Sequence, residues 1–460
     1  MILVLIIKIL GRLLACLPER AVAALCYGIG TVLALLPTPR RRVGLSNLAH
    51  AFPDKPPHWH RRVFRESLRR LVEMTLLNLA SMYFDANRVQ HMIHVPEALQ
   101  RLSHKLQQER RGVLLLAPHL SLLEILAFVP AHFPPEQKFG SLFRPFDNPH
   151  LNRLVQKTRE RWGGTLISRK NALKEAFDML NQGGRVIVFF DQNVGRRGAL
   201  IPFFGRVAST SYLPGLLMKR CQVPVYMLYP HRTAFWRIEL SIEAIPGPQT
   251  IENITVESHR CLESYLQRSE DNCSDWLWVH KRWKTQDNPR SRLQIQAKKQ
   301  FYNEDDLKGE AFPIANRTRF WIYLPDNFSE AKQAVPLLKA LRRSRPDAAL
   351  TLLGQRAWLD QMATYDVADE YLGLPGSTLA LFAQCWRWRR RYPDTAIVLN
   401  TALRSEIAMA LTRAPQRFGL AYPGQKRPFL THCQSLSAAA KTESGLDRHW
   451  QDGLRHFGLK

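Results

Sequence analysis

Residues 113–124, Val-Leu-Leu-Leu-Ala-Pro-His-Leu-Ser-Leu-Leu-Glu, carry the clearest indication of fold and chemistry in the chain. Val113 to Ala117 is a short apolar run that stops at Pro118, as expected for a buried strand. His119 follows, and Glu124 lies five positions further on. Open α/β sheets bind their ligands at the carboxyl ends of the strands. The stretch therefore predicts an α/β fold with a polar pair at one edge of its sheet.

The spacing of His119 and Glu124 is weak evidence when taken alone. With 15 His and 39 Asp plus Glu in 460 residues, about one such pair is expected by chance. A second copy, His104 and Glu109, lies in a charged stretch with the composition of a solvated helix surface. His119 differs because it follows a buried strand. An imidazole oriented by a carboxylate can remove a proton from an alcohol near neutral pH, so His119 is our candidate general base.

Length and charge limit the possible classes of protein. A chain of 460 residues is too long for one ordinary core, which predicts two domains. The net charge of +26 indicates an anionic partner. The sequence has no recognisable nucleic-acid-binding module, so we expect no nucleic acid. Seven scattered cysteines without a Cys-x-x-Cys pair argue against a disulfide framework and a zinc site, and we expect no metal.

The first 42 residues predict a membrane anchor. Met1 to Leu17 is apolar except for Lys8 and Arg12, and residues 21–36 carry no charge. Each stretch is slightly short for a membrane span, so an interfacial helix pair and a short span with snorkelling cations fit equally well. A buried core helix is the remaining alternative. The Arg40–Arg42 cluster favours the cytoplasmic side of the membrane.

Strands and helices alternate along the rest of the chain, in two segments. We expect an α/β domain at 43–286, a polar linker at 287–316 and a Rossmann-like half domain at 317–460. In the first segment, helices are expected at 61–79, 120–129, 148–162, 171–181 and 255–268, and strands at 113–117, 139–143, 165–168, 186–190, 223–229 and 236–245. In the second, helices are expected at 329–343, 379–391 and 403–412, and strands at 320–324, 349–353 and 395–399.

Further polar residues follow other predicted strands of the first segment. Arg144 opens a loop with two prolines, and Asp191 and Gln192 end an apolar run. An arginine near an acyl carbonyl offsets oxyanion charge or holds an anionic substrate, and Asp191 is suited to organise it. Taken singly, each residue also fits an ordinary role: an ion pair for Arg144, a helix cap for Asp191, and core packing for the nearby Phe203 and Phe204.

Taken in order, these motifs resemble the late (lauroyl/myristoyl) acyltransferases of lipid A biosynthesis, over about residues 1–286. The resemblance rests on His119-x4-Glu124, Arg144-Pro145, Asp191-Gln192, Phe203-Phe204-Gly205 and the aromatic, basic stretch Trp276–Lys284, preceded by Arg42–Leu48 and Ala51-Phe52-Pro53. It implies transfer of a fatty acyl chain from an acyl carrier protein, or from acyl-CoA, to a hydroxyl of a lipid A precursor. The reaction would take place at the cytoplasmic face of the inner membrane and need no cofactor.

The resemblance also implies roles for single residues. Glu124 would accept the Nδ1–H of His119, whose Nε2 would then take the proton of the acceptor hydroxyl. Arg144 would stabilise developing charge, and Asp191 and Gln192 would support the substrate pocket. The chain has no Gly-x-Ser-x-Gly motif, which agrees with direct attack by the substrate hydroxyl. The basic charge would suit an acidic acyl carrier protein and the lipid phosphates. The Trp276–Lys284 stretch is expected either at the headgroup level or as core tryptophans with a solvated basic edge.

Residues 317–432 are similar to the amino-terminal, acceptor-side domain of the ADP-heptose:lipopolysaccharide heptosyltransferases. The similarity rests on Phe320–Pro325, Arg345-Pro346-Asp347 and Arg417-Phe418-Gly419. The Gly-Asp motif of that family, whose Asp is taken as catalytic, appears here as Ser329-Glu330. Glu330 is thus a possible acceptor-sugar residue, although a plain acid at a helix start is the favoured interpretation. Without a sugar-nucleotide domain, we expect a module that grips core sugars or a partner.

Two other functions stay open at this point. The chain could be a non-catalytic lipopolysaccharide-binding or scaffold protein that uses the same fold. It could also acylate a different glycolipid or an amino-acid lipid. The presence of His119, Glu124, Arg144 and Asp191 together favours the lipid A acyltransferase.

Overall fold

The computed structural model describes residues 2–168, 172–284, 288, 292–295, 298–303, 314–435, 453 and 455. They form two compact units. The first comprises Met1–Leu48, Lys55–Val194 and Thr210–Lys281, and the second comprises Ala49–Asp54, Gly195–Ser209 and Arg282–Lys460. Most of the expected linker 287–316, the first residue of the helix expected at 171–181, and most of the chain after residue 435 lie outside the described residues.

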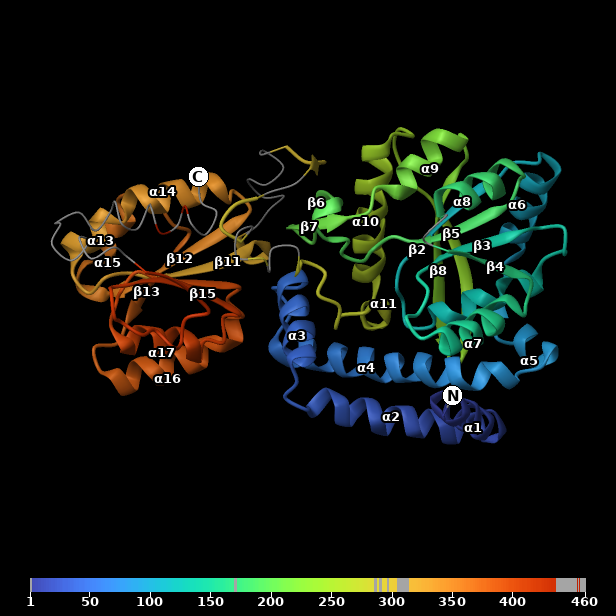
Figure 1. Ribbon diagram of the computed structural model, residues 1–460, viewed down its shortest axis with the longest axis horizontal. Helices are drawn as coiled ribbons and strands as arrows, with labels where there is room; N and C mark the ends of the chain where they lie inside the picture. Colours follow the sequence, from blue (N-terminus) through green and yellow to red (C-terminus); the bar gives the residue numbers. More distant parts are fainter. Residues whose placement is uncertain are drawn as a thin grey trace. The chain divides into compact units, whose positions relative to one another are not determined.

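A seven-stranded sheet forms the core of the first unit (Figure 1). Its spatial order is β1 (Ile93–His94), β9 (Arg237–Ala244), β8 (Val225–Ala234), β2 (Val113–Ala117), β5 (Arg185–Phe189), β3 (Phe139–Phe143) and β4 (Gly164–Ser168). Every pairing is parallel except that of β8 with β9. The sheet is therefore mixed, and the α/β class expected from the sequence is confirmed.

Helices cover both faces of this sheet. They are α5 (Ala86–Gln90), α6 (Glu97–Gln108), α7 (Pro149–Glu160), α8 (Ala172–Asn181), α9 (Leu213–Cys221), α10 (Ile251–Arg268) and α11 (Glu270–Asp275). Val113 and Leu115 of β2 lie on the α6 side, where they line a cavity, and α9 also contacts β2. The strand is buried between these layers, which explains its unbroken apolar sequence.

The helix expected at 120–129 differs from the prediction. The structure has a 3₁₀ helix, η2, at Leu123–His132. Pro130 lies inside it and lacks the N–H that an α-helix would use. Residues 118–122 thus remain a loop between β2 and η2, and this loop carries His119.

Three helices form a layer at one side of the first unit (Figure 1). α1 (Ile2–Cys16) and α2 (Glu19–Leu35) contact the long α4 (Pro57–Ala80), which leads to η1 (Ser81–Tyr83). Two glycines allow this close approach. A Cβ on Gly11 would lie 2.2 Å from the Leu79 carbonyl oxygen, and one on Gly30 would lie 2.5 Å from the Arg69 Cα. Among the described helices, none alone has the length and apolar character of a membrane span; α2 and α3 (Pro39–Ala51), bent by 87°, meet that criterion only as a pair.

The second unit is built on a six-stranded sheet in which all pairs are parallel. Its order is β13 (Glu370–Leu374), β12 (Ala348–Gln355), β11 (Thr318–Tyr323), β14 (Thr395–Val398), β15 (Gln416–Ala421) and β16 (His432–Ser435). Numbered along the chain, this is the 3-2-1-4-5-6 order of a doubly wound sheet. The sequence prediction of half such a domain missed three of these strands, β13, β15 and β16.

The helices of the second unit include the three expected ones, of which one is divided, and α15, which the sequence analysis did not predict. They are η6 (Ile314–Asn316), α13 (Phe328–Gln333), α14 (Val335–Ser344), α15 (Arg356–Ala363), α16 (Thr378–Trp388), η7 (Arg389–Arg391) and α17 (Leu403–Leu411). The helix expected at 329–343 is divided at Ala334 because Pro336 starts a new helix at its first turn. η3 (Gly195–Arg197) and a small sheet of β10 (Lys299–Gln300), β6 (Ala199–Phe203) and β7 (Arg206–Thr210) complete the described elements.

Candidate active site

His119 and Asp191 meet at the carboxyl edge of the first sheet. β2 and β5 are parallel neighbours, and Ala117 is in register with Phe189. His119 and Asp191 each lie two residues beyond these aligned positions, so the register brings them together. The His119 amide donates to Asp191 Oδ2 at 3.1 Å, and Nδ1 lies 2.6 Å from Oδ1. Because an ionised carboxylate can only accept, Nδ1 carries the proton and donates it.

Asp191 is a buried and ionised carboxylate. It is 1% exposed, and it also accepts a hydrogen bond of 2.7 Å from the Trp276 indole. Burial by itself raises the pKa of Asp191, but the charge of the His119 ring and the hydrogen bonds from His119 and Trp276 outweigh it. The pKa therefore lies well below its usual value. With Asp191 on Nδ1, the His119 tautomer is fixed and the lone pair lies on Nε2.

Glu124 does not contact His119 as the sequence prediction required. It is the second residue of η2 and forms an ion pair with Arg159 of α7, at 2.6 and 2.9 Å. The expected His119–Glu124 hydrogen bond is therefore wrong, since the neighbouring strand supplies Asp191 to the imidazole instead. Glu124 fixes the position of Arg159, a residue that the sequence analysis did not single out.

His119, Glu124 and Arg159 line one cavity of about 330 Å³. The remaining wall is largely apolar and includes Met74, Leu126, Phe143, Leu166, Phe189 and Leu277. The His119 ring packs against Phe189 with a centroid distance of 5.1 Å. Its side chain is 19% exposed, so the imidazole is accessible from the cavity. The cavity combines a long apolar wall with a few convergent polar groups, as lipid-binding enzyme sites require.

Arg144 and Gln192 occupy different positions relative to this cavity. Arg144 is exposed and lines the cavity directly after β3. Gln192 follows Asp191 and is half-buried, and it is not among the described residues that line the cavity. Among the described residues, no group of His, Cys, Asp or Glu is arranged to hold a metal ion.

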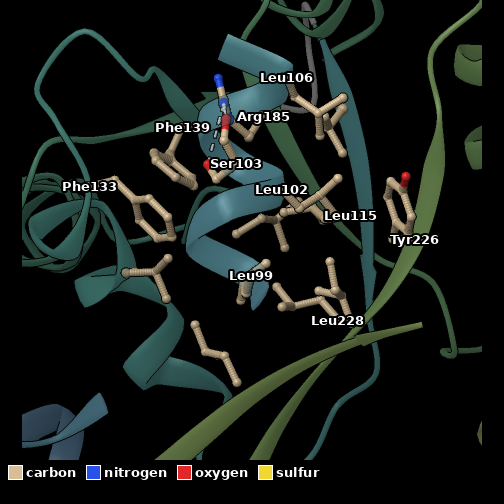
Figure 2. Close-up of a pocket in the computed structure, with 15 residues that line it drawn as sticks. Leu99, Leu102, Ser103, Leu106, Leu115, Phe133, Phe139, Arg185, Tyr226 and Leu228 are labelled. Carbon is tan, nitrogen blue, oxygen red and sulfur yellow. Dashed lines mark hydrogen bonds between the residues drawn. The ribbon is translucent and has the colours of Figure 1, made fainter. Parts of the chain in front are cut away.

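A second, smaller cavity lies on the same face of the sheet (Figure 2). It measures about 40 Å³, and its wall is formed mainly by aliphatic and aromatic side chains from α6, β2 and β8, among them Leu102, Leu115 and Leu228. Phe139 and Ile187 line both cavities. At one end the Arg185 guanidinium donates to the carbonyl oxygen of Ser103 at 2.8 Å. The apolar wall thus continues from the His119 cavity toward the amino ends of the strands.

The other sequence motifs belong to the second unit or to the buried core. Phe203, Phe204 and Gly205 belong to the β6–β7 hairpin of the second unit, where Phe204 and Gly205 adopt positive φ angles in a tight turn. Trp276, Trp278 and Trp283 are buried, so these tryptophans are core residues and the headgroup interpretation is wrong. Arg282 of the same stretch is buried as well, so the basic edge is not solvated throughout as expected. Glu330 is half-buried in the first turn of α13, and its N–H donates to the Asn327 side chain at 2.8 Å.

The first part of the chain is similar to known proteins of lipid A biosynthesis. Residues 1–285 match the family model of the bacterial lipid A biosynthesis acyltransferases. The chain is 25% identical to the lipid A biosynthesis palmitoleoyltransferase of Escherichia coli over 280 residues, which is 59% of this chain and 88% of the relative. It is 23% identical to a lipid A biosynthesis acyltransferase of Haemophilus influenzae over 242 residues, 50% of this chain and 72% of the relative.

Similar solved structures correspond to a smaller part of the chain. A family 9 glycosyl transferase from Veillonella parvula is 19% identical with a TM-score of 0.28, over 31% of this chain and 42% of that one. The E. coli ADP-heptose lipopolysaccharide heptosyltransferase II is 16% identical with a TM-score of 0.25, over 29% of this chain and 43% of that one. This chain spans less than half the length of either. From the match over residues 1–285, the chain belongs to the bacterial lipid A biosynthesis acyltransferase family and is an enzyme of that family.

Proposed function

We propose that this enzyme transfers a fatty acyl chain from an acyl thioester, carried by acyl carrier protein or CoA, to a hydroxyl of a lipid A precursor, with His119 as general base. The single observation that supports this most is the His119–Asp191 pair at the mouth of an apolar cavity. A fixed tautomer, a buried carboxylate and space for a hydrocarbon chain are what direct acyl transfer to an alcohol needs.

The proposed steps balance without a covalent enzyme intermediate. His119 Nε2 takes the proton of the acceptor hydroxyl while that oxygen attacks the thioester carbonyl carbon. Asp191 holds the Nδ1–H and stabilises the imidazolium that forms. The tetrahedral intermediate collapses, the C–S bond breaks, and Nε2 returns the proton to the leaving thiolate. The products are the new ester and the free thiol.

The cationic side chains of the cavity would stabilise the negative charge that develops on the thioester carbonyl oxygen, or bind an anionic substrate group. Arg144 at the rim is placed to offset oxyanion charge or to hold an anionic substrate. The ion pair with Glu124 fixes the orientation of the Arg159 guanidinium in the wall of the His119 cavity. Glu124 therefore acts on the cation and not on the base.

The two apolar cavities are suited to the acyl chain. We assign the thioester end to the cavity beside His119 and the methyl end to the direction of the smaller cavity (Figure 2). Phe139 and Ile187 would contact the chain where the two cavities adjoin. The hydrogen-bonded Arg185 head closes the far end, which limits how far a chain can extend.

α1 and α2 are suited to bind the membrane in which the acceptor lies. Both expose apolar side chains away from α4, including Leu5 and Leu13 of α1 and Val32 and Leu35 of α2. A contiguous set of exposed apolar side chains marks a contact with lipid or with another protein. We propose that the two helices lie in the cytoplasmic interface of the inner membrane, with nearby cations such as those of Arg40–Arg42 contacting lipid phosphates.

The test is acyl transfer by the purified full chain in lipid vesicles, followed by mass spectrometry of the lipid product. We expect His119→Ala to lower transfer at least a thousandfold. His104→Ala is the matched control, because His104 has the same spacing to an acidic residue but lies exposed on α6. Undiminished transfer by His119→Ala would overturn the proposed mechanism, and absence of transfer by the unmodified chain would overturn the proposed substrates.

A further inference from the structure

The segment Asp275-Trp276, where α11 ends, contacts both halves of the His119–Asp191 pair. The Trp276 indole N–H donates to Asp191 Oδ2 at 2.7 Å. The Trp276 backbone forms an antiparallel bridge with Leu120, the residue after His119. The Trp276 carbonyl oxygen also accepts a hydrogen bond of 2.9 Å from Ser67 of α4. One buried tryptophan thus contacts the carboxylate with its ring and the histidine loop with its backbone.

Asp275 holds the same loop from its other side. Its Oδ1 accepts from the Ser121 hydroxyl at 2.5 Å and from the Arg70 guanidinium at 2.6 Å. Asp275 is 2% exposed, and Arg70 comes from α4. The loop between β2 and η2 is therefore attached to α4 through Asp275 and Ser121, in addition to its contacts with Asp191.

We infer that Trp276 is a positioning residue that sets the basicity of His119 through Asp191, while Asp275 keeps the histidine loop in place. The inference rests on the proposed role of His119 as general base. Trp276 itself does not line the His119 cavity among the described residues. Its effect is therefore expected through Asp191 and not through the substrate.

The direction of the effect follows from the hydrogen bond. The indole N–H places the positive end of its dipole on Asp191 Oδ2 and shares the charge of the carboxylate. Without it, the full charge of Asp191 would act on the His119 ring and favour the imidazolium. His119 would then stay protonated to a higher pH, and the acid limb of the rate profile would move upward.

Other charged groups surround the pair and must stay constant in the test. Glu124 from η2, Arg159 from α7 and Arg144 after β3 share the cavity with His119. Asp275 and Arg70 lie behind the loop, on α11 and α4. The hydrogen bond from the Trp276 indole N–H to Asp191 is the contact that the test removes.

The experiment compares Trp276→Phe with Trp278→Phe. The two indoles are both buried and lie 4.7 Å apart, but the Trp278 N–H donates to the Cys273 carbonyl oxygen at 2.7 Å. Both variants lose a similar ring volume and one hydrogen bond. We expect Trp276→Phe to lower kcat about tenfold or more and to move the acid limb of kcat/KM upward by about half to one pH unit. Trp278→Phe should leave the limb where it is.

Equal pH profiles for the two variants, or a downward shift in Trp276→Phe, would overturn the inference. If Trp276→Phe does not fold, benzothienylalanine at position 276 replaces only the N–H by sulfur and should give the same upward shift. An NMR titration of His119 in the isotope-labelled Trp276→Phe and Trp278→Phe proteins compares the two variants without enzymatic turnover. If the unmodified protein transfers no acyl group but Trp276→Phe still shifts the His119 titration upward, the proposed function is contradicted and the inference is supported.

Discussion

Two clusters of buried polar groups lie at opposite edges of their own sheets. In the first unit, His119 and Asp191 follow the carboxyl ends of β2 and β5 and lie beside a cavity. In the second unit, Thr318, Asp347 and Asp394 lie at or just before the amino ends of β11, β12 and β14. Because α/β sheets bind their ligands at the carboxyl ends of the strands, we propose that the first cluster is reactive and the second structural, and we call their positions the reactive edge and the structural edge.

The partners of these groups differ in the same way. Asp347 forms a fully buried ion pair with Arg345 at 2.7 Å, and Asp394 pairs with Arg206 at 2.9 Å. Each carboxylate has a guanidinium, which cannot lose its proton. Asp191 instead pairs with an imidazole, which changes its charge near neutral pH. On the proposed mechanism, burial and ion pairing alone do not identify a catalytic carboxylate, whereas pairing with a titratable imidazole does.

The largest expected effect concerns the reactive edge. We expect Asp191→Asn to lower kcat about 10³- to 10⁴-fold, because an amide no longer fixes the Nδ1–H tautomer of His119. The thermal midpoint should change far less than in variants of the Arg345–Asp347 pair. Single-turnover rates and circular dichroism melting measure the two quantities. If Asp191→Asn lost its activity only because it unfolds, Asp191 would be a structural carboxylate like Asp347, and the two edges would not differ in role.

The second effect concerns the structural edge. Arg345→Ala leaves the Asp347 carboxylate buried without its charge partner, so we expect the second unit to lose about 3–5 kcal/mol of stability. Chemical denaturation, followed by the fluorescence of tryptophans, measures this loss. An unchanged unfolding midpoint would show that the buried pair contributes nothing.

Acid titration gives an independent check of the same edge. Burial raises the pKa of Asp394, but the charge of Arg206 and further arginines lowers it to about 2. Arg345 likewise holds the pKa of Asp347 below its ordinary value. Since both folded-state values lie below the unfolded ones, this stability is complete above about pH 4 and is lost as the pH falls toward 2. Asp394→Asn should remove part of that acid dependence in equilibrium unfolding.

A smaller effect is expected for the residue pair that the sequence analysis misassigned. Glu124→Gln weakens the hold on Arg159 but leaves the His119–Asp191 contact intact. We expect kcat to fall about tenfold to a hundredfold without a shift of the acid limb. A fall as large as that of Asp191→Asn would show that Glu124 acts on the base after all.

The smallest effect should be a change in chain-length preference. Leu102→Trp places a larger ring at the wall of the smaller cavity. We expect the ratio of rates with longer and shorter acyl donors to fall several-fold, while the best short donor keeps most of its rate. Measuring transfer with a series of acyl thioesters tests this. An equal loss of rate for all donors would show that the acyl chain does not bind in the smaller cavity.

The sequence predicted local features well and pairing across strands poorly. The strand at Val113–Ala117 was predicted with its observed bounds, since an apolar run ending at proline is a local signal. The partner of His119 was missed, because a spacing within one segment cannot report which strand lies beside β2. Asp191 was singled out, but its role depended on the β2–β5 register. Trp276, 85 positions from Asp191, and Arg159 gave no local signal of their contacts.

The most direct test of the account is the pH dependence of single-turnover acyl transfer by the unmodified chain and by Asp191→Asn. The account predicts a rate that rises as His119 loses its proton in the unmodified chain. In Asp191→Asn we expect a rate lower by about three orders of magnitude. A variant that keeps the pH profile and a rate within tenfold of the unmodified chain would contradict the central claim that Asp191 orients the catalytic base.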